Sequence, residues 1–259
     1  MICNIMFWKL PTGHESISTP SVLILGMAVW LIYVLDRLLD NQKDPLIFTE
    51  RHLFHQSNQR ILWFCVMICT GVCAGLLFFI PFNIIKFGIV IALTTAFYLL
   101  IINQVSSQNA FQHYKEPITA FVYVSGVFGT TILNKTSMFS SQIGFTFLLI
   151  VFQNLLLFSL FELKKNGKAI NLASYLGIPK SNMLIILLTC LIFGFGYAGF
   201  SNSSEFIYFK YEQNIFLVEI LMSFILLVIS QWDRFFLIND RYRWVGDGIF
   251  LLPLLIIFR

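Results

Sequence analysis

The chain has 259 residues, of which 58% are hydrophobic and 12% charged, with a formal net charge of +4 and a mean hydropathy of +0.79. This balance excludes a water-soluble globular protein, in which roughly a quarter of the residues are charged. Nothing in the composition suggests a nucleic acid as a partner.

Apolar runs recur along the chain, each long enough for a helix to cross a hydrocarbon core of about 30 Å. The runs are continuous rather than alternating, so the expected fold class is all-α, a polytopic transmembrane helical bundle. We expect eight spans, at residues 20–38, 61–81, 84–103, 117–134, 140–161, 181–200, 213–232 and 244–258. Residues 1–19 lack the pattern of a secretory signal, so we expect an N-terminal non-cytoplasmic segment at 1–19 and one bundle at 20–259.

Three cysteines of the second expected span, Cys65, Cys69 and Cys73, follow one another at four-residue steps. They fit either close packing of small side chains or a metal or redox site. The span contains no histidine or acid to complete a site, which favours packing.

The basic residues divide unevenly between the two sides of such an eight-span chain. Five fall on one side: Lys9, Lys86, Lys135, Lys210 and Arg259. The other side has twelve: Arg37, Lys43, Arg51, Arg60, Lys115, Lys164, Lys165, Lys168, Lys180, Arg234, Arg241 and Arg243. Nine of the thirteen acidic residues share the second side. The positive-inside rule assigns this side to the cytoplasm and both termini to the outside, with the plasma (inner) membrane as the expected location.

The first expected cytoplasmic loop has three carboxylates at four-residue steps, Asp36, Asp40 and Asp44. On a continuing helix they share one face, where like charges repel and require a compensating cation. Mg²⁺ bound by carboxylates, with its other ligands from a phosphate or diphosphate, meets this requirement. The alternative is a set of ordinary surface ion pairs with the neighbouring cations Arg37, Lys43 and Arg51.

This segment resembles the first aspartate-rich motif of the UbiA-type membrane prenyltransferase superfamily, with Asp36 and Asp40 matching the last two aspartates. Ile32 and Tyr33 stand where the family motif has an asparagine and a further aspartate. The following Lys43-Asp44-Pro45 and Glu50-Arg51-His52 are similar to the short family elements that close over the diphosphate.

Two later segments extend the resemblance. Residues 114–127 resemble the lysine-led fourth helix of many members, which implies that Lys115 lies near the phosphates. Residues 161–177 resemble the second motif and its tail, although Glu162 is the only carboxylate available there. Lys164 and Lys165 either bind phosphate directly or mark a member that has lost catalysis.

The resemblance implies Mg²⁺-dependent transfer of an isoprenoid chain from a prenyl diphosphate to a lipophilic acceptor within the membrane lipids. The implied catalytic residues are Asp36, Asp40 and Glu162, and the metal ligands are Asp36, Asp40 and Asp44. The implied diphosphate-binding residues are Arg37, Arg51, Lys115, Lys164 and Lys165. The alternatives are a non-catalytic membrane protein that binds isoprenoid lipids or a partner and, less favoured, a transporter.

The last expected cytoplasmic loop, residues 233–247, carries three further candidates: Asp240, Arg243 and Asp247. It fits a lid over the site, a substitute for the missing aspartates, or an ion-paired connection between two helices. Acids inside a span are functional candidates in general, and Asp247 near the start of the last span is of more interest than Glu219, which we assign to packing.

Overall fold

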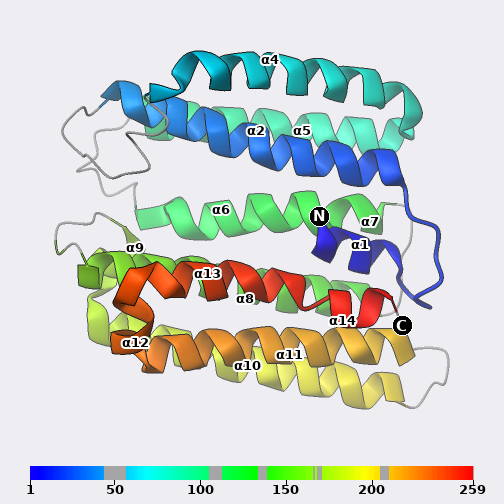
Figure 1. Ribbon diagram of the computed structural model, residues 1–259. Helices are drawn as coiled ribbons and strands as arrows, with labels where there is room; N and C mark the ends of the chain where they lie inside the picture. The colour runs from blue at the N-terminus through cyan, green and yellow to red at the C-terminus, as the bar shows by residue number, and fades with distance from the viewer. Residues whose placement is uncertain are drawn as a thin grey trace. The chain divides into compact units, whose positions relative to one another are not determined.

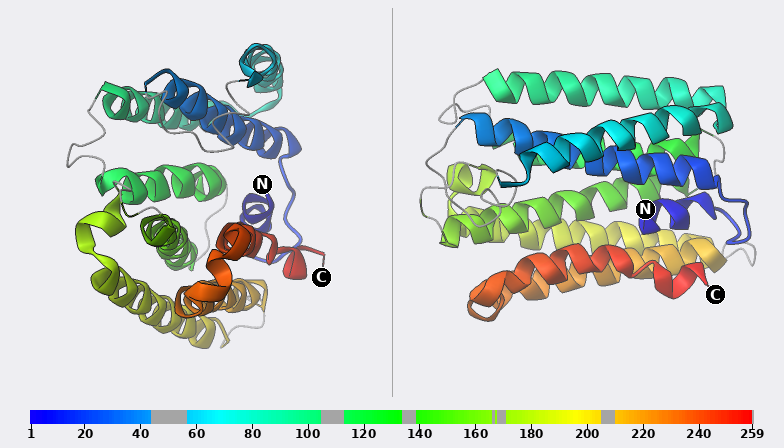
Figure 2. Two further views of the ribbon diagram at one scale, coloured as in Figure 1. Left: turned by 60° about the vertical axis from the view of Figure 1, so that its left-hand side comes forward. Right: turned by 45° about the horizontal axis from the view of Figure 1, so that its top comes forward.

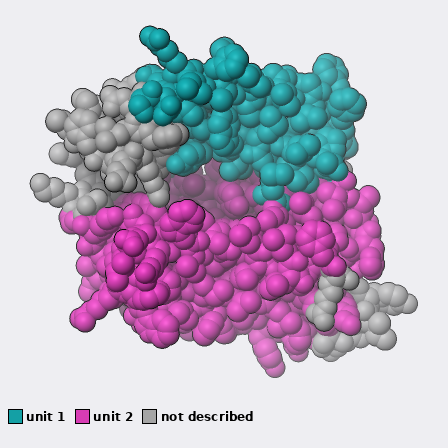
Figure 3. Space-filling model, in the orientation of Figure 1, with its two compact units in different colours: residues 1, 18–106 teal, residues 2–17, 107–259 magenta. Residues whose placement is uncertain are grey.

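The computed structural model describes residues 1–43, 57–104, 113–133, 139–165, 167, 171–204 and 210–258. Side chains are described throughout these ranges except at residues 36, 37, 39–43, 99, 102–104 and 204. Within this part of the chain the regular elements are helices and no strand occurs, so the predicted all-α fold class is confirmed. The helices form two compact units, one of residues 1 and 18–106 and one of residues 2–17 and 107–259 (Figure 3).

Unit 1, of residues 1 and 18–106, is a group of long helices. Its elements are α2 (Thr19–Lys43), α4 (Gln59–Leu76), the 3-10 turn η1 (Leu77–Phe79) and α5 (Phe82–Gln104) (Figure 1). Helix α2 packs against α4 through Val34, Leu38 and Val66. The chain leaves η1 at Ile80, which has φ −112° and ψ 141°, because the residue before a proline avoids the helical conformation.

Unit 2, of residues 2–17 and 107–259, is larger and contains the first and the last helix of the chain. Its N-terminal half consists of α1 (Ile2–Trp8), α6 (Lys115–Val124), the π-helical turn η3 (Ser125–Gly129), α7 (Thr130–Ile132), α8 (Ser140–Lys165) and α9 (Leu172–Leu176). Its C-terminal half consists of α10 (Ile178–Ser204), α11 (Lys210–Gln231), α12 (Asp233–Leu237), η5 (Ile238–Asp240), α13 (Arg241–Gly248), η6 (Ile249–Leu251) and α14 (Leu254–Ile257).

Helix α8 lies inside unit 2, in contact with α6, α9, α10, α11 and α13 (Figure 1, Figure 2). Its buried Gln153 donates a hydrogen bond to Thr189 Oγ1 of α10 at 2.9 Å and accepts one from Ser223 Oγ of α11 at 2.8 Å. An amide buried without such partners would cost about 1–3 kcal/mol. These bonds therefore fix the positions of three long helices relative to one another.

The chain turns sharply between α11 and α13. Asn239 and Asp240 have positive φ angles of 52° and 53°, a conformation that Asn and Asp tolerate better than most residues. Helix α13 then approaches α8 closely at Gly246, where an added Cβ would lie 2.6 Å from the Phe158 ring. The turn thus brings α12 and α13 to the C-terminal end of α8.

Four helices of the described part are long and apolar enough to cross a membrane: Gln59–Phe79, Ser140–Lys165, Ile178–Ser203 and Lys210–Gln231. The apolar stretches of α2 and α5, Thr19–Leu35 and Phe82–Tyr98, are shorter. The expected span at 117–134 is helical in shorter pieces, which are α6, η3 and α7. The expected span at 244–258 likewise consists of α13, η6 and α14. Four potential spans are thus established out of the eight expected.

The N-terminal segment contributes a helix to the packed structure. Cys3, Met6 and Phe7 of α1 are buried within unit 2. Asn4 Nδ2 donates to the carbonyl oxygen of Val127 at 2.6 Å, and Tyr211 of α11 donates to the carbonyl oxygen of Met6 at 3.0 Å. Residues 2–8, which the sequence placed in a segment preceding the bundle, therefore pack as part of unit 2.

Candidate functional site

The predicted magnesium ligands belong to the end of α2. This helix continues without interruption to Lys43, so Asp36 and Asp40 are one helical turn apart on it. The side chains of Asp36, Arg37 and Asp40 lie outside the described part of the chain, as do all atoms of Asp44 and Arg51. Their roles as metal and phosphate ligands stay predictions.

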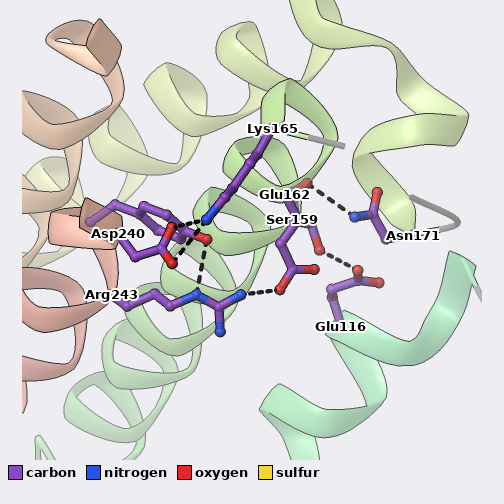
Figure 4. Close-up of polar contacts among 8 residues, drawn as sticks. Glu116, Ser159, Glu162, Lys165, Asn171, Asp240 and Arg243 are labelled. Atoms are coloured by element: carbon purple, nitrogen blue, oxygen red, sulfur yellow. Dashed lines mark hydrogen bonds and ion pairs between the residues drawn. The ribbon is translucent and has the colours of Figure 1, made fainter. Parts of the chain in front are cut away.

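The charged residues at the end of α8 form ion pairs with the α12–α13 turn. Glu162 Oε1 lies 2.6 Å from Arg243 Nη2, and Lys165 Nζ lies 2.8 Å from Asp240 Oδ1 (Figure 4). Lys164 Nζ forms a third pair with Asp233 Oδ2 at 3.1 Å. Two of the three predicted lid residues, Asp240 and Arg243, thus contact the predicted second motif, whereas Asp247 is exposed on α13.

Arg243 is held in place by an aromatic cluster. Its Nε donates to the hydroxyl of Tyr242 at 2.9 Å. The Tyr242 ring is buried, stacks on Phe161 with centroids 4.7 Å apart and meets Phe158 edge-on at 5.7 Å. Burial raises the pKa of Tyr242, so it remains a neutral hydrogen-bonding group. The guanidinium therefore has a fixed position from which to reach Glu162.

Asp233 was not among the residues predicted for the site. The hydrogen bond from Lys164 lowers the pKa of its carboxyl, so it stays ionised further into the acid range. The two residues are 69 positions apart in the chain. The sequence shows only an acid at the start of a loop, so no local signal could have indicated this pair.

A second cluster surrounds Glu116 at the start of α6. Its Oε1 accepts hydrogen bonds from the Ser159 hydroxyl of α8 and from the Leu172 N–H of α9, the latter at 3.2 Å. Its Oε2 is buried with no hydrogen-bond partner among the described residues. Burial raises the pKa of Glu116, although the Ser159 hydrogen bond opposes this shift. The structure therefore favours the protonated carboxyl more than an exposed position would.

Asn171 connects this cluster to α9. Its side-chain Nδ2 donates to the carbonyl oxygen of Ser159 at 3.0 Å. Its side-chain Oδ1 caps the helix by accepting from the Ser174 N–H at 2.9 Å. His113 Nδ1 lies 3.2 Å from the Asn171 carbonyl oxygen, and its ring stacks on Tyr175. In the sequence, Glu116 is one of the nine acids on the expected cytoplasmic side, and no pattern there predicts this cluster.

The two clusters lie at the same end of α8, because Ser159 and Glu162 are three residues apart on that helix (Figure 4). Lys115, a predicted phosphate ligand, is half-buried beside Glu116, whose pKa it acts to lower. Unit 2 thus gathers Lys115, Lys164 and Lys165 with carboxylates around one helix end.

No family model, curated protein or solved structure matches this chain. The residues themselves must therefore carry any functional argument.

Metal-ligand side chains are not clustered in the described part of unit 2. No group of three or more His, Cys, Asp or Glu side chains is placed to bind one in the part of the chain that is described. Glu162, the predicted second-motif carboxylate, is bound to Arg243. The α2 aspartates differ, since carboxylates one turn apart are the hard oxygen donors that Mg²⁺ prefers.

Proposed function

We propose that the chain is an integral membrane protein of eight spans that binds a prenyl diphosphate with Mg²⁺ and transfers its isoprenoid chain to a lipophilic acceptor. The observation that carries the proposal is the uninterrupted helix α2, which continues from an apolar stretch, Thr19–Leu35, to Lys43. This continuity supports the placement of Asp36 and Asp40 one turn apart just beyond the apolar stretch, as the aspartate motif requires. The basic residues gathered at the end of α8 are consistent with a phosphate-binding role in unit 2.

The proposal assigns Mg²⁺ to Asp36 and Asp40, with Asp44 as a further ligand. When bound, the ion would neutralise the diphosphate and make it a better leaving group. Arg37 and Arg51 would add positive charge beside the aspartates.

Lys115, Lys164 and Lys165 are the cations that unit 2 can offer to phosphate oxygens. Lysine binds phosphate as a point charge. In the proposed reaction the bond between the first isoprenoid carbon and the diphosphate oxygen breaks, and the electron pair leaves with the diphosphate. The resulting allylic cation forms a bond to the acceptor, which loses a proton. The chain contains 29 phenylalanines, and aromatic ring faces stabilise cations of this kind.

A second candidate, a non-catalytic protein that binds isoprenoid lipids or a partner, is favoured by the ion pairs at the end of α8. An opposite charge lies within 3.1 Å of each of Glu162, Lys164 and Lys165. In this candidate, these three residues serve mainly to hold the α12–α13 turn. A transporter has less support. Transporters are typically built from two repeats with paired broken helices, whereas the feature found in this sequence is one aspartate motif.

The location follows from the charges of the sequence. The proposed active face is cytoplasmic, because twelve of the seventeen basic residues would then face inward. The proposed membrane is the plasma (inner) membrane.

The test is release of diphosphate from a long-chain prenyl diphosphate by the purified protein, with Mg²⁺ and a mixture of lipophilic acceptors. Enzymatic transfer predicts release by the wild type and none by Asp36→Asn/Asp40→Asn. Prenyl diphosphate binding without release would support the non-catalytic candidate. Absence of both would exclude the transferase and any relative that binds prenyl diphosphates.

A further inference from the structure

An exposed aromatic surface lies at the turn that follows α11. Trp232, Phe235 and Trp244 are 66%, 54% and 81% exposed, although they are large apolar side chains. Phe236, the neighbour of Phe235, is buried, so α12 packs one face inward and turns an aromatic face outward. An outward aromatic face is unfavourable in water and typical of a membrane–water interface.

The position of this surface along the chain agrees with an interface. Helix α11 is a 22-residue apolar helix long enough to cross a membrane, and α12 begins at Asp233, two residues after α11 ends at Gln231. The first residues beyond a span lie at the depth of the lipid headgroups. Trp232 lies between the two helices.

Two arginines belong to the same surface. The guanidinium of Arg241 lies over the Phe235 ring at 4.6 Å from its centroid, which joins α12 to α13. Trp244 is three residues after Arg241 on α13 and therefore on a neighbouring part of that helix. Arg234 is exposed on α12.

Two carboxylates of the turn are paired with lysines, and Asp247 further along α13 is exposed. Asp233 pairs with Lys164 and Asp240 pairs with Lys165, both from α8. The salt bridges of the described ranges do not include Arg241, and Arg234 interacts electrostatically with its neighbour Asp233, which Lys164 also contacts. The surface thus offers two arginines among exposed aromatic rings, which complements a negatively charged and amphipathic ligand.

We propose that the α12–α13 turn, through Trp232, Arg234, Phe235, Arg241 and Trp244, is a docking surface for the headgroups of anionic phospholipids. The aromatic rings enter the headgroup region and the two arginines bind lipid phosphates. None of these five residues is a proposed prenyl diphosphate ligand, although the turn adjoins Lys164 and Lys165, which pair with its Asp233 and Asp240. Lipid binding at this surface does not require transfer activity.

The experiment uses the full chain in bilayer nanodiscs of mixed anionic and zwitterionic phospholipids. Bromine on a lipid acyl chain quenches tryptophan fluorescence. One sample contains brominated anionic lipid and the other contains brominated zwitterionic lipid, at the same overall lipid composition, and tryptophan fluorescence is measured in both. The attraction of one basic residue to an anionic surface, about 1 kcal/mol, corresponds to a preference of about fivefold. We therefore expect clearly stronger quenching by the brominated anionic lipid, and a weaker preference at high salt.

Variants locate the effect. Arg234→Gln/Arg241→Gln should abolish the stronger quenching by the anionic lipid, and Arg234→Lys/Arg241→Lys should retain most of it. Trp232→Phe/Trp244→Phe should remove the fluorescence that reports this difference. Lys210→Gln, at the opposite end of α11, removes one exposed positive charge and should leave the preference unchanged.

Equal quenching by the two brominated lipids in the wild type would overturn the proposal, even if a variant failed to fold. So would a preference that survives in the Arg234→Gln/Arg241→Gln variant. Quenching of Trp232 and Trp244 by iodide in water instead of by lipid would show that the surface faces solvent, where a protein could bind it, and would also contradict the proposal.

Discussion

Glu116 occupies a position in which its ionised form is disfavoured. Its carboxyl accepts hydrogen bonds from Ser159 and Leu172 through one oxygen, while the other is buried without a partner among the described residues. Burial raises its pKa above the ordinary value of 4.5, so the folded protein binds this proton more tightly than the unfolded chain does. Stability from this group is therefore fully present below pH 4.5 and is lost as the pH rises through the raised pKa.

Replacement of Glu116 by glutamine should remove this pH dependence. Glutamine keeps an oxygen for Ser159 and Leu172 but cannot ionise, so the unfolding temperature of the wild type should fall relative to Glu116→Gln as the pH rises above 4.5. Thermal unfolding of both proteins in detergent across the pH range measures this. A constant difference between them at every pH would contradict the interpretation. Ser159→Ala should lower stability by about 1 kcal/mol and leave a pH dependence in place.

At the scale of elements, the close approach of α13 to α8 depends on a glycine. A Cβ added at Gly246 would lie 2.6 Å from Phe158 Cε1 and 2.9 Å from Asn154 Oδ1, whereas nothing lies within 4 Å of a Cβ at Gly248. Both glycines belong to the same helix. They therefore form a matched pair of sites for substitution.

Gly246→Ala should destabilise the protein by about 1–3 kcal/mol, because the methyl group forces α13 away from α8. Gly248→Ala should be neutral or stabilise slightly, since alanine favours a helix more than glycine does. Unfolding midpoints of the two variants in the same detergent give the comparison. Equal midpoints would mean that the two helices are not packed as described.

The long helices could be predicted from apolar runs, and the short elements could not. The run at 140–161 corresponds to α8 and the run at 213–232 to α11, because the width of a bilayer sets the length of such helices. Helix α9 has only five residues and depends on local signals, the Asn171 cap and the positive φ of Gly177, which a search for apolar runs does not detect.

The candidate site could be predicted only in part for a similar reason. The sequence identified Glu162, Lys164 and Lys165 as charges at a helix end, but their partners lie 69 to 81 positions further along the chain. Pairing over that distance is decided by the turn at Asn239 and Asp240 and by the packing of α13 on α8. The Glu116 cluster likewise requires three helices to meet.

For the whole molecule, the charge distribution predicts which side of the membrane each end of α11 faces. Lys210 is the first residue of the helix, on the expected outer side, and Asn239 follows the helix on the expected cytoplasmic side. A membrane-impermeant thiol reagent should label Lys210→Cys in intact cells and Asn239→Cys only after permeabilisation. Peptide-level mass spectrometry separates these sites from the five native cysteines. Labelling of both positions in intact cells would contradict a membrane-spanning α11, and the reverse pattern would contradict the orientation.

The most direct test of the account is equilibrium binding of a radiolabelled prenyl diphosphate to the purified protein, measured with Mg²⁺ and with a chelator. The account predicts binding that requires Mg²⁺ and weakens by at least about tenfold, or 1.4 kcal/mol, in Asp36→Asn/Asp40→Asn. Glu15→Gln, which removes a carboxylate outside both motifs, should bind as the wild type does. Binding that is independent of Mg²⁺ and equal in all three proteins would contradict the role of the α2 aspartates, and absence of binding would contradict the proposed function itself.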